Sequence, residues 1–255
     1  MAHGAAKKAL ELDDNLAEAH ASLASVNMLS EWNWLAADTE FKKAIELNGS
    51  DVTARHWYAE YLSAMGHHHE AIAEIEKAVQ ISPLSLIIKR DVGWHYYCAG
   101  QYDDAIAQLR KTLKLALPGD KKTEPVHWLL GYAYVKKSMF TEAIDEMKYA
   151  LNLNNNSSNR ARLIYAYACA GRRDEALRQL EDLKKESSDG SPDLPFLLAT
   201  VYGELGDKDQ AFACLDQVFD RHSGKLVYLN VVPMLDSLRS DQRFRSLTLR
   251  VGLPQ

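Results

Sequence analysis

The sequence predicts an all-α protein that is built as a solenoid of antiparallel helix pairs. Alanine recurs every 33 to 38 residues, at Ala37, Ala71, Ala105, Ala143, Ala176 and Ala211. Four of these alanines follow a glycine by five residues, at Gly66, Gly100, Gly171 and Gly206. Apolar residues around each alanine recur at helical spacing. A period of about 20–50 residues is typical of a repeat array, in which each unit packs only on its neighbours.

The order of the elements follows from this period. Residues 1–16 correspond to the second helix of a truncated repeat, because AAKKALELDDN aligns with FKKAIELNGSD and IEKAVQISPLS. We interpret the chain as a piece of a longer protein, although the first helix could also be a genuine cap. Six repeats are predicted over 17–221, at 17–51, 52–85, 86–123, 124–156, 157–191 and 192–221. Residues 222–255 lose the period and are predicted to form an atypical C-terminal cap that ends in an amphipathic helix.

Small residues are expected where the two helices of a pair cross most closely, for example at Ala59 and Gly93. The turn glycines end the first helices, where a left-handed backbone conformation costs little only for glycine. Trp32 and Ser138 occupy this glycine position in two repeats. Trp32 and Trp34 flank an unusual turn and could form a docking knob. Aromatic residues in such a place more often cover a helix junction.

This order of small and large residues resembles the tetratricopeptide repeat over nearly the whole chain. The resemblance implies a right-handed superhelix with the first helices on its concave side. Segments such as HWYAEYLSAMG, and the stretch from Leu205 to the end, are similar to the C-terminal tetratricopeptide region of large bacterial regulators. In those proteins the array follows an effector, such as a winged-helix domain, a serine/threonine kinase or an adenylate cyclase. The present sequence contains none of these effector domains.

Composition limits the location and partners of the chain. The net charge of −5 argues against nucleic-acid binding, which favours a basic surface. No stretch approaches the roughly 18 apolar residues of a transmembrane helix, and no signal peptide is visible. Cys98, Cys169 and Cys214 are too scattered for a disulfide framework. We therefore predict a cytoplasmic protein that contacts neither nucleic acid nor membrane.

No pattern for catalysis emerges from the sequence. Phosphate-binding glycine loops, the G-x-S-x-G nucleophile turn and the H-E-x-x-H zinc motif are all missing. The three adjacent histidines His67–His69 lie in a predicted turn, and neighbouring side chains of a turn cannot all reach one ion. They are interpreted as a solvated turn, so that no enzyme activity, no cofactor and no metal are predicted.

The concave side assigned by the resemblance carries the candidate binding residues. They are aromatic or charged residues of the first helices: His56, Glu60, Arg90, Trp94, Tyr97, Trp128, Tyr132, Tyr165 and Phe196. Aromatic residues and arginine are enriched at binding hot spots. The alternative is that the rings are packed between repeats, because aromatic stripes at helical spacing usually belong to a core.

These observations predict a non-enzymatic interaction module that belongs to a bacterial signalling regulator. Its concave groove would bind a peptide, a protein partner or another domain of its own parent chain. Two alternatives stay open: a sensory module for a small ligand, and a scaffold that self-associates through the ends of the solenoid.

Overall fold

The computed structural model describes residues 2–186 and 190–254, and in these ranges the structure is helical without strands. The first seven α-helices are α1 (Ala2–Leu12), α2 (Ala17–Leu29), α3 (Trp34–Leu47), α4 (Val52–Ala64), α5 (His68–Ile81), α6 (Leu86–Cys98) and α7 (Tyr102–Leu113). The remaining seven are α8 (Glu124–Lys136), α9 (Phe140–Leu153), α10 (Ser157–Cys169), α11 (Arg173–Lys185), α12 (Leu194–Leu205), α13 (Lys208–Asp220) and α14 (Gln242–Val251). Three short 3-10 helices are η1 (Lys121–Thr123), η2 (Gly224–Tyr228) and η3 (Pro233–Leu238). Over the described ranges, no helix is both long and apolar enough to cross a lipid bilayer.

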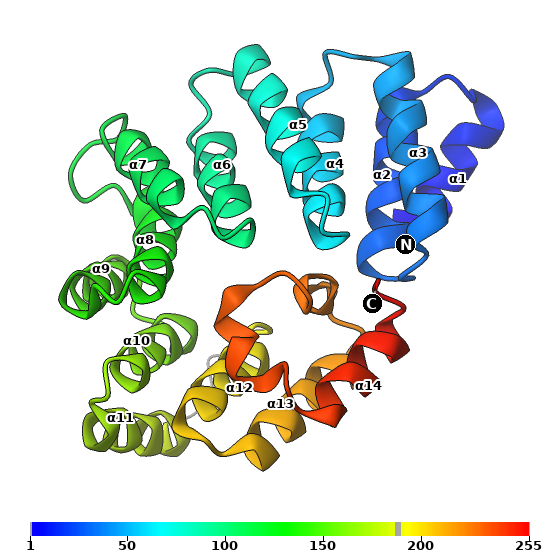
Figure 1. Cartoon of the computed structure of the whole chain (residues 1–255). Coiled ribbons are helices and arrows are strands. Elements are labelled where there is room, and N and C mark those ends of the chain that lie inside the picture. Colours follow the sequence, from blue (N-terminus) through cyan, green and yellow to red (C-terminus); the bar gives the residue numbers. More distant parts are fainter. Residues whose placement is uncertain (1, 187–189, 255) are drawn as a thin grey trace.

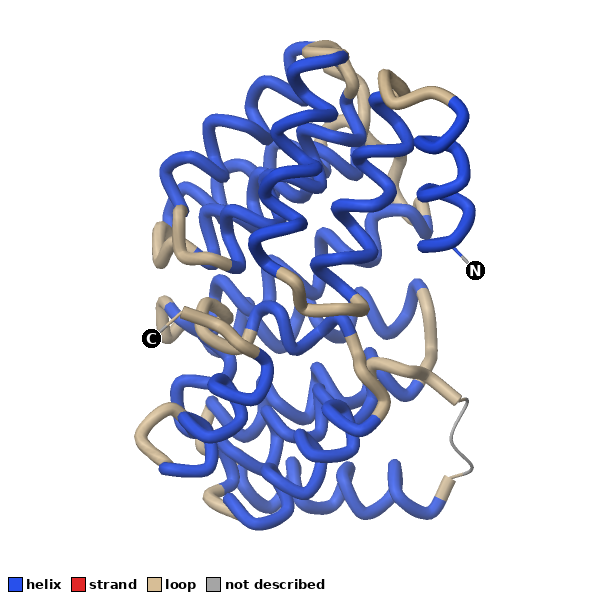
Figure 2. Tube along the Cα trace, turned by 90° about the vertical axis from the view of Figure 1, so that its right-hand side faces the viewer, coloured by secondary structure: helices blue, strands red, loops and turns tan. Residues whose placement is uncertain are grey.

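The helices pair in sequence order from α2/α3 to α12/α13, and each pair packs on the next. Figure 1 shows the pairs following one another around a ring, and Figure 2 shows helices joined by loops throughout. The predicted all-α solenoid is thereby confirmed. The limits of the individual repeats stay a prediction.

Small residues lie at the helix crossings as expected. A Cβ atom on Gly93 would lie 2.6 Å from Cγ of Leu109, so α6 and α7 approach too closely for any side chain there. In the preceding pair, Ala59 and Ala71 are both fully buried. The periodic small residues therefore set the distance between paired helices.

In two helix pairs, a residue in the turn after the first helix has a left-handed backbone conformation that favours glycine, although it is not glycine. Trp32 has a φ angle of 49° and Ser138 one of 58°, whereas Gly66 in the equivalent turn has 82°. His222 adopts the same left-handed conformation at the end of α13, with φ at 49°. The turn geometry is thus kept in every pair, and the two substituted positions carry its steric cost.

The two ends of the solenoid meet. The Trp32 ring stacks on His222 with 4.2 Å between ring centroids, and it lies 5.3 Å from Phe219. The indole N–H of Trp34 donates a hydrogen bond of 3.2 Å to the carbonyl of Val251 at the end of α14. Both tryptophans cover a junction within the chain, and this contact between the first repeat and the last helices closes the ring (Figure 1).

Residues 224–238, which contain η2 and η3, lie inside this ring and are called the inner segment below (Figure 1, orange). Leu226, Leu229 and Leu235 are fully buried in the main core together with residues of α6 to α13. Val227 belongs to the core formed by α2, α3, α4 and α5. The inner segment therefore covers much of the concave face that a tetratricopeptide solenoid would leave open. Helix α14 does not lie on this face.

The turn geometry leads to opposite effects for two glycine substitutions. Ser138 is exposed, so Ser138→Gly should raise the free energy of unfolding by roughly 0.5–1 kcal/mol through relief of the left-handed backbone. Trp32→Gly gives the same relief but removes the aromatic ring that joins the two ends of the solenoid. This change should lower the free energy of unfolding by about 1–3 kcal/mol. Urea unfolding followed by circular dichroism measures both. Stabilisation by Trp32→Gly would show that the ring closure contributes nothing.

The burial of the inner segment predicts how its leucines contribute to stability. Leu229→Ala should lower the free energy of unfolding by about 2–5 kcal/mol, because it opens a cavity in a fully buried site. The control is Leu249→Ala on α14, where the side chain is 57% exposed and the change should stay within about 0.5 kcal/mol. Equal urea midpoints for the two variants would mean that the inner segment is not part of the folded core.

Candidate functional site

A pocket of about 300 Å³ remains between the inner segment and the first helices. Its walls come from α4, α6, α8, α10, α12 and the inner segment. The lining residues are Glu60, Arg90, Asp91, Trp94, Trp128, Leu129, Tyr132, Arg162, Asp193, Phe196, Leu197, Lys225, Tyr228, Val232 and Met234. The ring thus gathers, around one cavity, residues that are up to 174 positions apart in the sequence.

Six of the nine predicted groove residues line this pocket: Glu60, Arg90, Trp94, Trp128, Tyr132 and Phe196. His56 is half-buried and contacts Glu60 and Asp91. Tyr97 and Tyr165 are buried on either side of Tyr132, at ring distances of 6.2 and 5.6 Å, and lie outside the pocket lining. Some of the predicted rings therefore line the pocket and others are packed between helices, whereas a role in binding stays a prediction.

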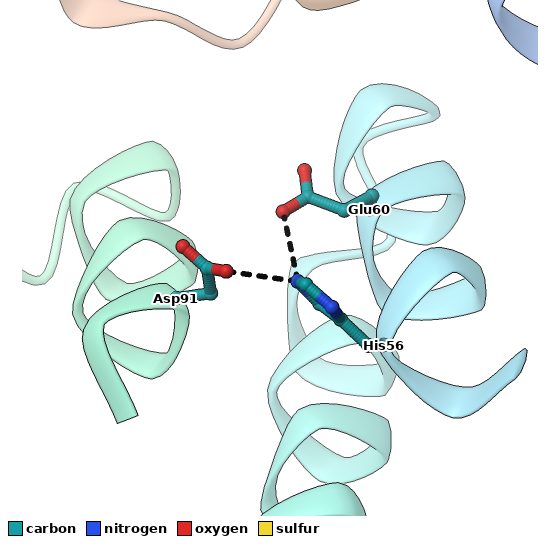
Figure 3. Close-up of side chains that lie close together, drawn as sticks. All are labelled: His56, Glu60 and Asp91. Atoms are coloured by element: carbon teal, nitrogen blue, oxygen red, sulfur yellow. Dashed lines mark ion pairs between the residues drawn. The ribbon is translucent and has the colours of Figure 1, made fainter. Parts of the chain in front are cut away.

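One wall of the pocket contains a charged cluster between α4 and α6 (Figure 3). His56 Nε2 lies 2.8 Å from Asp91 Oδ2 and 3.8 Å from Glu60 Oε1. Arg90 binds the same Asp91 carboxylate with two hydrogen bonds, of 2.6 Å from Nε and 2.8 Å from Nη2. The hydroxyl of Tyr228, from the inner segment, donates a short hydrogen bond to the other oxygen of Glu60. This last bond anchors the inner segment to α4.

Burial and pairing shift the pKa values of the two carboxyl groups of this cluster in opposite directions. Burial raises the pKa of Glu60 above its usual range, and the nearby Asp91 charge acts in the same sense. Burial would also raise the pKa of Asp91, but hydrogen bonds from His56 and Arg90 outweigh it and leave that pKa lowered. Asp91 is therefore the ionised partner of Arg90, and Glu60 is the carboxyl group that takes up a proton more readily.

The opposite wall is aromatic and cationic. The Arg162 guanidinium lies 4.6 Å from the centre of the Trp128 ring, and its Nη1 donates a 2.8 Å hydrogen bond to Asn159. The Arg162 Nε atom is buried without a hydrogen-bond partner. Within the described ranges, no carboxylate pairs with Arg162. By contrast, Lys225 pairs with Asp193 at 3.1 Å.

The inner segment, Arg162 and Asp193 were missed by the sequence reasoning. Leu226–Leu229 is a short apolar run without a period, so nothing in it indicates that it folds back onto α2 and α4. Arg162 lies on α10 and is not among the nine predicted groove residues. The signal that could have found it is its place one turn before Ala166, on the side of α10 that faces the preceding repeat.

Comparison with known proteins identifies the repeat. Residues 52–83 and residues 196–224 each match a family profile of the tetratricopeptide repeat. Among curated proteins, no sequence matches this chain significantly.

Several solved structures share the fold at low sequence identity. PilF of Pseudomonas aeruginosa matches with a TM-score of 0.57 and 19% identity, over 84% of this chain and 96% of its own. PilW, a type IV pilus biogenesis factor, gives 0.57 and 18%, over 80% and 92%. A chain of the APC/C hetero-tetramer Cut9–Hcn1 gives 0.61 and 18%, over 96% of this chain and 45% of its own. Two segments of the present chain are thus recognisable tetratricopeptide repeats, and its fold is that of a tetratricopeptide solenoid.

Proposed function

We propose that this chain is a non-enzymatic interaction module whose central pocket binds a carboxylate group of a peptide or protein partner. The observation that carries this proposal is Arg162, the pocket cation that has no carboxylate partner in the described part of the chain. Tetratricopeptide repeats form protein interaction modules. A structure of similar fold is part of a hetero-tetramer, Cut9–Hcn1.

The charges of the pocket favour an anionic group at Arg162 over other positions. Arg90 is neutralised by two hydrogen bonds to Asp91, and Lys225 is paired with Asp193. The Nε–H of Arg162 has no hydrogen-bond partner, and the guanidinium lies against the Trp128 ring. A planar guanidinium of this kind binds a carboxylate with two parallel hydrogen bonds. Trp128 and Trp94 add apolar area beside that position.

The size of the pocket restricts the length of the bound segment. A volume of about 300 Å³ accommodates one or two side chains, and the inner segment occupies the space that an extended peptide would need. The partner would therefore insert an acidic side chain or a chain terminus, and the remainder would lie outside the ring. Self-association through the solenoid ends is not part of this proposal, because α13 and α14 are packed against the first repeat.

A small carboxylic acid is the second candidate, and the size and lining of the pocket favour it. Sites for small ligands are typically cavities of about 300–1,000 Å³ with mostly apolar walls and a few convergent polar groups. This pocket lies at the lower end of that range, with aromatic walls and a single unpaired guanidinium. The chain would then be a sensory module in which the ligand bridges α10 and the inner segment.

The resemblance of the sequence to the C-terminal arrays of bacterial regulators supports a role in signalling. In such a protein the ring would report its ligand or partner to an effector domain. Sequencing the reading frame upstream of the codon for Met1 examines this context. A winged-helix, kinase or cyclase domain is expected there, and an unrelated neighbouring gene would remove this part of the proposal.

Binding is tested with a library of peptides that end in a free carboxylate or in an amide, and with a thermal-shift screen of small carboxylic acids. Arg162→Gln should weaken binding of the selected ligand by about 10- to 100-fold, because hydrogen bonds to a charged group are worth about 1.5–3 kcal/mol. The control is Arg160→Gln, which removes a charge of the same helix outside the pocket.

The outcomes separate the two candidates. Binding of carboxylate-terminated peptides and not of free acids supports the interaction module, and the reverse result supports the sensor. Equal affinity of wild type and Arg162→Gln for every selected ligand would overturn the proposed site.

A further inference from the structure

Two pairs of potential metal ligands face each other between α4 and α6. His56 and Glu60 are four residues apart on α4, and Asp91 and His95 are four residues apart on α6. Side chains at this spacing lie on one face of a helix. The ligand atoms of His56, Glu60 and Asp91 all lie within 4.8 Å of one another (Figure 3).

The environment of His95 supports a metal site independently of the geometry of the other three residues. It is fully buried, and neither of its ring nitrogens has a hydrogen-bond partner. Its Nε2 atom lies 3.9 Å from Glu60 Oε1, so the unpartnered imidazole is directed at the cluster. A buried polar group of this kind is costly unless another group satisfies it.

We propose that His56, Glu60 and Asp91, with His95 as the fourth ligand, form a binding site for a divalent transition-metal ion, best matched by Zn²⁺. This inference does not depend on the proposed function of the pocket. Two imidazoles and two carboxylates form a mixed nitrogen and oxygen ligand set, which suits zinc better than Ca²⁺ or Mg²⁺.

The distances agree with such a site. Four ligands at about 2.0–2.2 Å from a tetrahedral zinc ion lie roughly 3.4 Å from one another. The separations here are 2.8 Å for His56–Asp91, 3.8 Å for His56–Glu60 and 3.9 Å for Glu60–His95. The ligand atoms of His56, Glu60 and Asp91 lie within 4.8 Å of one another, and the His95 ring would have to move closer to His56 and Asp91 to complete the coordination.

The groups that would orient the ligands are already in place. Tyr228 donates a hydrogen bond to the second oxygen of Glu60, which leaves Oε1 directed at the cluster. Arg90 holds the Asp91 carboxylate through both of its oxygens. Outer groups of this type fix the orientation of metal ligands.

The site is tested by isothermal titration of the chelator-treated protein with zinc chloride. One Zn²⁺ per chain is expected to bind, and the melting temperature should rise with zinc. His56→Ala should weaken binding by at least about 100-fold, and Tyr228→Phe by about 10-fold. Glu60→Gln keeps the side-chain shape and removes the charge, so it repeats the test if His56→Ala unfolds. Circular dichroism checks the folding of each variant.

The exposed turn histidines provide the matched control. His67→Ala/His69→Ala, called the turn variant, removes the exposed His67 just before α5 and the exposed His69 in the first turn of α5, and it should bind zinc as wild type does. In addition, Co²⁺-loaded wild type should show the strong visible absorption of a four-coordinate site. Loss of binding in the turn variant with retention in His56→Ala, absence of saturable binding, or the weak spectrum of six-coordinate Co²⁺ would each overturn the proposal.

Discussion

The packing of the inner segment against the first helices is the contact on which the rest of this structure depends. A curved array of helix pairs has an inward face that is apolar at several repeats. Here the chain covers that face itself, because Leu226, Leu229 and Leu235 are buried among helices from opposite parts of the ring. Val227 of the same segment is buried against α2, α3, α4 and α5, so this apolar burial joins the last residues of the chain to its first repeats.

The closed ring has a consequence for the chemistry of the molecule. An open solenoid is stabilised by contacts between neighbouring repeats only. In this chain Trp32 also contacts His222, and Tyr228 also contacts Glu60, so residues about 170–190 positions apart stabilise each other. Polar groups of the inward face are thereby enclosed, and the desolvation of Glu60 raises its pKa. The pocket at Arg162 lies between the inner segment and the first helices, and the Tyr228 hydroxyl of the inner segment contacts Glu60 in the cluster at Asp91.

The fold could be predicted from the sequence because the residues that determine it lie close together in the chain and recur in each repeat. Ala71 and Gly93 mark helix crossings within one pair, and the glycine position before each second helix identifies the turns. The structure confirms this reading even at Trp32 and Ser138, which adopt the glycine conformation without being glycine.

The site could be predicted only in part, because it depends on contacts without sequence regularity. Glu60, Arg90, Trp94 and Trp128 followed from their register on first helices, and they do line the pocket. Asp91 and His95 lie on the side of α6 that faces the preceding repeat, so a search of one repeat at a time does not connect them with His56. The inner segment has no period, and its partners are spread over several helices. Its position is set by tertiary packing alone.

Hydrogen exchange of the backbone amides, resolved by mass spectrometry, tests the central claim most directly. If residues 224–238 cover the inner face of the ring, their amides should exchange slowly, with protection comparable to that of α8 and α12. Fast exchange of this segment, together with slow exchange of the helices, would contradict the account. It would show that the solenoid is stable with an open concave face.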